Sequence, residues 1–344
     1  MPVTTLADLT TLRLGGPAGE LVVAEDEGTL VDAVRAADAS GTPALVVAGG
    51  SNLVVADAGY PGTVVLVRTR GVHVESDMCG GAYVTVAAGE DWDSFVARAV
   101  GEDWQGVECL SGIPGSVGAT PVQNVGAYGQ EVGAALARVR TFDRVAGEQR
   151  TFMHADLGLG YRTSRFKAEP GRFLVLDVTF QMKLSGTSGP LAYAELARAL
   201  GAEVGARAPL ADVRDAVLAL RRGKGMVLDP DDHDTWSAGS FFTNPLLDRA
   251  TADRLPDDAP RWPADGGRVK TSAAWLIERA GFAKGYGAGA ATLSTKHTLA
   301  LTNRGGARTE DLLALARDVR DGVRARFDVV LEPEPVLVGC SLDG

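Results

Sequence analysis

A segment dense in glycine and proline, residues 110–129 (LSGIPGSVGATPVQNVGAYG), is the feature that most constrains this chain. Glycine allows a backbone φ above zero, whereas proline fixes φ and lacks an N–H donor, so the segment cannot form a regular helix or strand. It can bring backbone N–H groups close to a flat or phosphate-bearing ligand, because few Cβ atoms stand in the way. A surface loop of this length would carry charged residues, and this one carries none. We therefore predict a buried segment that lines a cofactor.

Length and composition limit the class of protein. The chain has 344 residues, of which 45% are hydrophobic and 23% charged, which predicts a soluble globular protein of two or three domains. The sequence has no apolar run long enough to cross a bilayer and no signal-peptide pattern at its N-terminus. The scattered Cys79, Cys109 and Cys340 favour a reducing cytosol and no metal site. A net charge of −10 disfavours nucleic acid as a partner.

Apolar periodicity gives a coarse secondary structure. Helices are predicted at residues 28–40, 91–100, 211–220, 271–281 and 309–327. Strands are predicted at residues 44–47, 64–67, 82–87, 142–144, 150–152, 173–183 and 329–338. In the last strand Glu332 and Glu334 would share one face, and Pro333 and Pro335 would confine the strand to an edge or its end.

Three short motifs carry candidate chemistry. Gly49-Gly50-Ser51-Asn52 follows a predicted strand and suits a pyrophosphate, although a hairpin turn explains it equally well and it is not GxGxxG. Residues 160–167 (GYRTSRFK) are either a solvated turn or the place where Arg162 binds a carboxylate in bidentate fashion. Ser240, in residues 236–245 (WSAGSFFTNP), is either a reactive hydroxyl or an ordinary turn serine, and the scarcity of histidine disfavours a hydrolase triad.

Taken together, these motifs resemble one known family. GGSN at 49–52, SGIPGSVGATPVQNVGAYGQE at 111–131, GYRTSRFK, GSFFTNP at 239–245 and LEPEP at 331–335 occur in the order found in the UDP-N-acetylenolpyruvoylglucosamine reductases (MurB). The resemblance extends from about residue 10 to residue 340. The second and fourth of these motifs are highly specific, whereas GGSN alone is weak.

The resemblance implies an α+β fold with two parts. A two-lobed FAD-binding domain of the vanillyl-alcohol-oxidase (PCMH) type is expected at 1–186, with lobes at about 1–67 and 68–186. A linker and substrate loop at 187–209 and a substrate-binding α+β domain at 210–344 are expected to follow. Tyr193 in PLAYAEL is similar to the tyrosine of the mobile substrate-covering loop, which indicates the subclass that has this loop.

The resemblance also implies an activity. It is the reduction of UDP-N-acetylglucosamine enolpyruvate to UDP-N-acetylmuramate in peptidoglycan synthesis, with non-covalent FAD and NADPH, in the cytoplasm, by a monomer. A flavin N5 hydride would reach the terminal carbon of the enolpyruvyl group, Ser240 would donate a proton, and Arg162 and Glu334 would stabilise the enolate. Glu334 helps only when protonated, so burial should raise its pKa. Pro335 replaces the usual valine of LEPEV and restricts Glu334 to extended conformations.

The remaining site residues are carried over from the same resemblance. The residues expected to bind the substrate are Tyr161, Tyr193, Lys224, Asn244 and His297. The residues expected to bind FAD lie in GGSN and in the central segment: Gly49, Gly50, Ser51, Asn52, Leu53, Gly112, Ile113, Pro114, Gly115, Gly118, Ala119, Asn124, Gly126 and Tyr128.

Two other functions have to be compared with this one. An FAD-linked oxidase of the same fold often tethers its flavin through histidine, and neither GGSN nor residues 111–129 contain a histidine. A nucleotide-sugar-binding protein that has lost catalysis would not be expected to keep Ser240, Arg162 and Glu334 together.

Overall fold

The computed structural model of the chain describes residues 5–77 and 81–343, so Cys79 lies outside the described residues. Residue contacts divide the chain into two compact units, and each is described here by itself. Unit 1 comprises residues 1–18, 50–60 and 223–344, whereas unit 2 comprises residues 19–49 and 61–222. The predicted domain boundaries at 186/187 and 209/210 stay a prediction. Within the described ranges, no helix has the length and apolar character needed to cross a bilayer.

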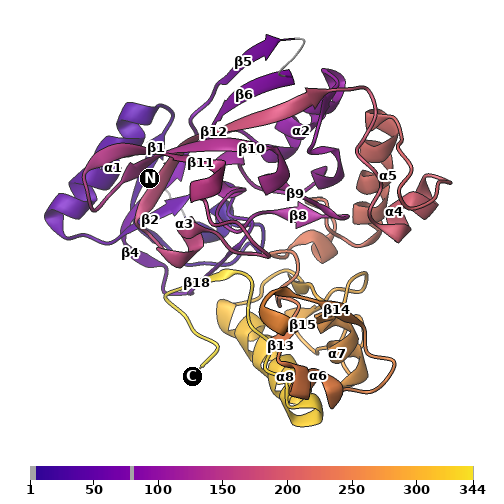
Figure 1. Cartoon of the computed structure of the whole chain (residues 1–344). Coiled ribbons are helices and arrows are strands. Elements are labelled where there is room, and N and C mark those ends of the chain that lie inside the picture. The colour runs from indigo at the N-terminus through magenta and orange to yellow at the C-terminus, as the bar shows by residue number, and fades with distance from the viewer. Residues whose placement is uncertain (1–4, 78–80, 344) are drawn as a thin grey trace. The chain divides into compact units, whose positions relative to one another are not determined.

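The main sheet of unit 2 is antiparallel, in the order β11-β10-β12-β6-β5 (Figure 1). Its strands are β5 (Val72–Asp77), β6 (Gly81–Ala87), β10 (Leu136–Asp143), β11 (Glu148–Met153) and β12 (Phe173–Leu184), and the short β7 (Trp104–Gln105) pairs with β12. The long strand β12 is central, and its Val178 is paired with Val139 on one side and Val86 on the other. The predicted strand 173–183 is therefore confirmed.

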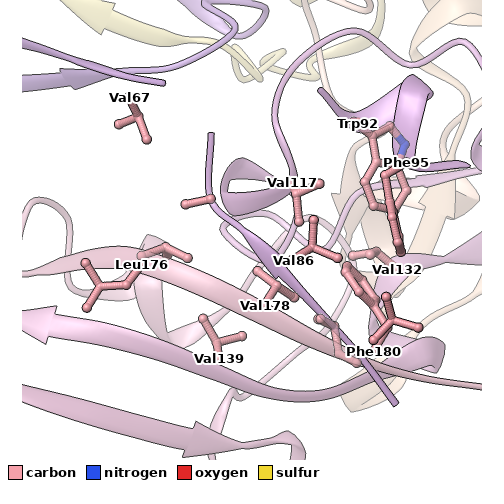
Figure 2. Packing of buried hydrophobic residues seen from close by; sticks show 14 of the residues in the cluster. Val67, Val86, Trp92, Phe95, Val117, Val132, Val139, Leu176, Val178 and Phe180 are labelled. Atoms are coloured by element: carbon pink, nitrogen blue, oxygen red, sulfur yellow. The ribbon is translucent and has the colours of Figure 1, made fainter. Parts of the chain in front are cut away.

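Helix α2 (Trp92–Gly101) packs on this sheet, as the prediction for residues 91–100 requires. Its N-terminus is capped by Asp91, whose side chain accepts the Ser94 N–H. Trp92 and Phe95 contact Phe180 of β12, with ring centroids 6.0 and 4.9 Å away. Figure 2 shows these rings beside the valines of β6, β10 and β12. This packing forms the large core of unit 2.

A second, three-stranded sheet in unit 2 has the order β1-β4-β2. Its strands are β1 (Ala18–Ala24), β2 (Ala44–Val47) and β4 (Tyr60–Val67), and β2 and β4 are parallel. Helix α1 (Glu27–Ser40), predicted at 28–40, buries Leu30, Val31, Val34 and Ala37 along one face. It ends at Gly41, whose φ of 67° is one that glycine adopts readily.

The rest of unit 2 contains α3 (Arg165–Ala168), α4 (Ala194–Ala199) and α5 (Leu210–Gly223). Helix α5 matches the predicted helix at 211–220. The segment predicted as linker and substrate loop contributes to a small core of its own. This core consists of Cys109, Leu191, Leu196, Ala197, Ala208, Val213 and Val217.

Unit 1 combines short strands with three helices in its described part. The helices are α6 (Arg249–Asp253), α7 (Ala273–Arg279) and α8 (Thr309–Phe327). The strands are β13 (Leu246–Leu247), β14 (Arg261–Pro263) and β15 (Val269–Thr271) in one sheet, β16 (Ala291–Leu293) with β17 (Leu301–Asn303), and β3 (Leu53–Val55) with β18 (Val336–Val338). Helix α8 has the predicted bounds, and its Leu312, Leu313, Leu315, Val319 and Val323 are buried in the core of unit 1.

Several predicted strands have different bounds in the structure; those predicted at 64–67 and 150–152, for example, are longer and correspond to β4 and β11. The strand predicted at 329–338 is wrong for its first part, because only Val336–Val338 pairs, in parallel with β3. Pro333 and Pro335 lack the N–H groups that a continuous ladder would need. The strand predicted at 142–144 is β10, which begins six residues earlier, at Leu136.

Phe180 offers a test of the core of unit 2. Phe180→Ala should lower the free energy of unfolding by about 3 to 5 kcal/mol, because it opens a cavity beside Trp92 and Phe95. Urea unfolding followed by tryptophan fluorescence measures the change. The control is Val145→Ala, since Val145 is 78% exposed and its loss should change stability by less than about 0.5 kcal/mol. Equal effects of the two variants would contradict this packing.

Candidate active site

The glycine-rich segment is irregular, as predicted, and its residues are mostly buried or half-buried. Among residues 110–129 only Ala119 and Gly129 are exposed, and the regular structure is limited to short turns and a two-residue ladder. Backbone bonds attach its middle to residues 88–92: Trp92 N–H donates to Gly115 O at 3.1 Å, and Gly118 N–H donates to Ala88 O at 2.9 Å. The segment therefore lies directly against the turn that leads into α2.

Two glycines in this region allow backbones to touch. A Cβ added to Gly118 would lie 2.5 Å from the Cβ of Ala88. A Cβ added to Gly49 would lie 2.5 Å from the Cα of Gly115, so the GGSN turn and the central segment meet at this point in unit 2. Such close approach of bare backbone suits a flat, phosphate-bearing cofactor.

Ser116 adds a polar group to the close-packed backbone around Gly49, Gly115 and Gly118, which we call the cofactor cradle. Its hydroxyl oxygen is buried and has no hydrogen-bond partner in the described part of the chain. A buried hydroxyl without a partner is unfavourable, which indicates that another molecule supplies one. The residues present therefore fit the predicted flavin, and Ser116 is a candidate ligand that the sequence-based prediction passed over.

The remainder of GGSN belongs to unit 1. Gly50 has a φ of 58°, and a Cβ there would lie 1.8 Å from Leu9 O, so only glycine fits. Ser51 and Asn52 form a turn, and Leu53 begins β3 rather than a helix, in agreement with the absence of a dinucleotide fingerprint. Asn52 Nδ2 donates to Glu334 O at 3.4 Å, which links the predicted cofactor motif to a predicted catalytic residue.

Arg162 of unit 2 lies against the glycine-rich segment. Its Nη2 donates to Gly126 O at 3.0 Å, and a Cβ at Gly126 would crowd its Nη1 at 3.3 Å. Gly160 and Thr163 close the turn that carries Arg162 through a pair of backbone bonds. The guanidinium also lies over the ring of Tyr161, 5.5 Å from its centroid. The structure thus brings the predicted cation to the predicted cofactor segment.

The two predicted tyrosines of unit 2 also meet. Tyr128 of the glycine-rich segment and Tyr193 at the start of α4 contact edge to face, with centroids 5.6 Å apart. Tyr193 is 46% exposed, so the ring of the proposed substrate loop is accessible.

A half-buried charge cluster joins α2, α5 and the glycine-rich segment. Asp93 accepts two hydrogen bonds from Arg214, at 2.7 and 2.9 Å, and one from the Gly112 N–H at 2.6 Å. Burial alone would raise the pKa of Asp93, but these hydrogen bonds outweigh it and lower the pKa below its usual value. Burial lowers the pKa of the nearby Arg221 to about 10, so its guanidinium stays charged at neutral pH. Lys224 follows directly after α5.

In unit 1 the backbone around Phe241 joins three predicted site residues. Phe241 N–H donates to the carbonyl oxygen of Leu299 at 2.7 Å, and Leu299 lies two residues after His297. Phe241 O accepts the Glu334 N–H at 2.8 Å, and Ser240 precedes Phe241 in the chain. The three distant segments that carry Ser240, His297 and Glu334 therefore meet at the backbone of Phe241.

The segment that carries Ser240 is held from both ends. Thr11 donates its hydroxyl proton to Ser237 O at 2.7 Å, and the guanidinium of Arg13 lies 3.7 Å from the centroid of Trp236. Asn244 accepts the Ala273 N–H at 2.9 Å, at the start of α7. Sequence patterns had not pointed to Thr11, Arg13 or Asp93, because their role depends on partners far away in the chain.

The predicted residues are divided between the units. Arg162, Tyr161, Tyr193 and the central segment belong to unit 2, whereas Ser240, Glu334 and the remaining predicted substrate residues belong to unit 1. Within the described ranges no group of three or more histidine, cysteine or acidic residues is arranged to hold a metal ion.

Comparison with known proteins identifies the family. A profile described as FAD binding domain matches residues 19–151, and one described as UDP-N-acetylenolpyruvoylglucosamine reductase, C-terminal domain, matches residues 229–338. UDP-N-acetylenolpyruvoylglucosamine reductases of Saccharopolyspora erythraea and Cutibacterium acnes are 58% and 57% identical to the chain. Each alignment covers 98% of this chain, and 96% and 90% of the respective relatives. The chain belongs to the UDP-N-acetylenolpyruvoylglucosamine reductase family.

The fold agrees with this membership. The crystal structure of UDP-N-acetylenolpyruvylglucosamine reductase (MurB) from Thermus caldophilus superposes with a TM-score of 0.67 at 26% identity and covers 97% of each chain. The predicted family, the FAD-binding α+β fold with its family-specific C-terminal domain, and the flavin-dependent reductase activity are confirmed. The subclass and the roles of single residues stay predictions.

Gly49 offers a test of the cofactor cradle. Gly49→Ala should weaken FAD binding by about tenfold or more, because the new methyl group would displace Gly115 from its position. Quenching of flavin fluorescence on titration of the apoprotein measures the dissociation constant.

The matched control is Gly101→Ala. Gly101 ends α2, and an added Cβ would have no heavy atom within 4 Å. FAD binding by this variant should equal that of the wild type. An unchanged dissociation constant in Gly49→Ala would show that the junction of Gly49 and Gly115 does not shape the flavin site.

Proposed function

We propose that this chain uses NADPH to reduce the enolpyruvyl group of UDP-N-acetylglucosamine enolpyruvate, which yields UDP-N-acetylmuramate for peptidoglycan synthesis. The proposal rests on two relatives named UDP-N-acetylenolpyruvoylglucosamine reductase, which are 57% and 58% identical to this chain over 98% of its length. The product is needed for cell-wall biogenesis, and hence for cell shape and division. Because the substrates are a nucleotide sugar and NADPH, the proposed place of the reaction is the cytoplasm. The family resemblance adds the proposal that the active form is a monomer.

The glycine-rich segment of unit 2 would hold the flavin. The bare backbone of Gly49, Gly115 and Gly118 and the buried hydroxyl of Ser116 are the groups that would contact it. The chemistry that bound FAD would supply is hydride transfer, from NADPH to the terminal carbon of the enolpyruvyl double bond. The residues of the chain have to manage the charge and the proton that this addition requires.

Hydride addition leaves negative charge on the carbon next to the carboxylate. Arg162 stabilises this charge, since a guanidinium binds a carboxylate with two parallel hydrogen bonds. Glu334 also stabilises the enolate, in its protonated form, because an ionised carboxylate would repel the developing charge. The bond from Phe241 O to the Glu334 N–H fixes the backbone of Glu334 beside the Ser240 segment.

Ser240 donates the proton that completes the reduction. A serine hydroxyl is a weak acid, so it can donate only to a strongly basic carbanion that is held at hydrogen-bond distance. Gly239, with a φ of 73°, and the bond from Phe241 to Leu299 set the direction of the segment on either side of Ser240. The substrate is bound by Tyr161, Tyr193, Lys224, Asn244 and His297.

The absorption spectrum of the purified protein tests the function as a whole. NADPH should bleach the flavin bands, and the enolpyruvyl nucleotide sugar should restore them. Restoration by oxygen alone, at a rate that the substrate does not change, would favour the oxidase of the same fold. Binding of the substrate without any oxidation of NADPH would favour an inactive nucleotide-sugar-binding protein.

The role of Ser240 is tested with Ser240→Ala. The variant should reduce its flavin with NADPH at the wild-type rate, whereas reoxidation by the substrate should slow by about 10²- to 10⁴-fold, as expected for the loss of a proton donor. Stopped-flow absorbance measures the two half-reactions separately. Equal slowing of both would rule out this role.

Arg162→Lys tests the need for a guanidinium. An ammonium group retains the charge but cannot form two parallel bonds to a carboxylate, so kcat/KM for the enolpyruvyl substrate should fall by at least about tenfold. Steady-state oxidation of NADPH, followed by its absorbance, gives this ratio. Turnover close to that of the wild type would remove Arg162 from the site.

A further inference from the structure

We infer that Asn124 is a positioning residue that holds the Arg162 turn in its working conformation, and that its side chain is not a flavin ligand. This inference rests on the proposed role of Arg162 in the reduction. It assigns Asn124, one of the residues expected to bind FAD, a separate task within the same segment.

The side-chain amide of Asn124 forms its hydrogen bonds within the protein. Asn124 is 2% exposed, and its amide donates to Glu131 Oε2 at 2.8 Å and to the Gly160 carbonyl at 3.2 Å. Its Oδ1 accepts the Gly133 N–H at 3.0 Å. A carboxylate and a carbonyl on the nitrogen, with an N–H on the oxygen, allow only one orientation of the amide. Both N–H donors are used, so none is left to bind a flavin.

The bond to Gly160 connects Asn124 with Arg162. Gly160 and Thr163 close the turn by two backbone hydrogen bonds, 3.2 and 3.3 Å long, and Arg162 lies between them. The Gly160 carbonyl therefore accepts from Thr163 within the turn and from Asn124 outside it. Asn124 is thus bonded to the base of the turn, while Arg162 itself donates to Gly126 O at its tip.

Arg162 needs this support because its backbone is strained. Its φ is 52°, in the left-handed region that residues with a side chain seldom adopt. Such a conformation persists only where neighbouring bonds hold it. Besides Asn124, the Ser164 hydroxyl donates to Val122 O and Lys167 Nζ donates to Arg162 O at 3.0 Å. The side chains of Asn124 and Ser164 are both 2% exposed and both bond the turn to the glycine-rich segment. Of the two, Asn124 is the one that bonds directly to the Gly160 carbonyl, which closes the Arg162 turn.

Substituting Asn124 by aspartate separates this role from that of a flavin ligand. Aspartate has the same shape and keeps the acceptor for Gly133, but it places an oxygen against Glu131 and the Gly160 carbonyl, which repels both. Glu131→Gln is the matched control, since its amide oxygen still accepts from Asn124. In the double variant Asn124→Asp with Glu131→Gln, the glutamine amide introduced by the second substitution donates to the new carboxylate, and only the bond to Gly160 stays lost.

Limited trypsin digestion reports on the turn without any use of activity. In the FAD-loaded protein, cleavage after Arg162 should be at least about tenfold faster in Asn124→Asp and in the double variant than in the wild type. Glu131→Gln should be cleaved at the wild-type rate. Mass spectrometry identifies the new termini. A rate after Arg162 that does not change in Asn124→Asp would overturn the inference, whether or not the proposed function holds.

Half-reaction kinetics and FAD binding complete the test. In Asn124→Asp and the double variant, flavin reduction by NADPH and the FAD dissociation constant should stay within about twofold of the wild type, while reoxidation by the enolpyruvyl substrate slows by about tenfold or more. Loss of FAD affinity in the double variant would identify Asn124 as a cofactor ligand and overturn the inference. A wild type that the substrate cannot reoxidise would instead refute the proposed function.

Discussion

Trp92 joins the hydrophobic core of unit 2 to the glycine-rich segment. Its ring packs against Phe95 and Phe180, while its indole Nε1–H donates to Leu110 O at 3.1 Å and its backbone N–H donates to Gly115 O. One fully buried residue therefore anchors both the beginning and the middle of a segment that has no ladder of its own. The shape of the cofactor cradle depends on this anchor, since glycine and proline supply few contacts by themselves.

The elements that could be predicted from the sequence are those whose signals are local. Helices α1 and α8 combine an apolar stripe with a clear stop, at Gly41 and at Asp328, and both have nearly the predicted bounds. Strand β10 was only partly predicted because its sequence contains Arg138 and Arg140. The second of these pairs with Glu27 and Asp177, partners that no pattern along the chain reveals.

The same distinction applies to the candidate site. The glycines and the three proposed catalytic residues stand in motifs specific enough to be found in one sequence. Asp93 and Thr11 stand outside these motifs, and Ser116 stands inside one without being singled out by it, because their importance comes from what they contact or fail to contact after folding. The C-terminal acidic motif shows that a local pattern can also predict too much. The residues around Glu334 have the pattern of a strand, yet two prolines leave only Val336–Val338 to pair.

Backbone strain gives an independent reason to place the functional site at the glycine-rich segment and the Ser240 segment. Among the described residues, the non-glycine residues with positive φ are Arg13, Asp103, Asn124, Tyr128, Arg162 and Asp328. Asp328 is explained by its place at the end of α8. Three of the others lie in the glycine-rich segment and the turn that docks on it, and Arg13 stacks on Trp236 in the segment that leads to Ser240.

Each such residue raises the free energy of the folded state by about 1 to 3 kcal/mol, so it persists only when other bonds outweigh it. Here those bonds are specific and at least partly buried: three for the Asn124 side chain, one from Arg162 to Gly126, and two from Asn303 to the backbone around Arg13. The usual preference of non-glycine residues for negative φ is therefore broken beside both the proposed cation and the proposed proton donor. A chain selected for chemistry as well as for stability is expected to break such local rules at its functional site.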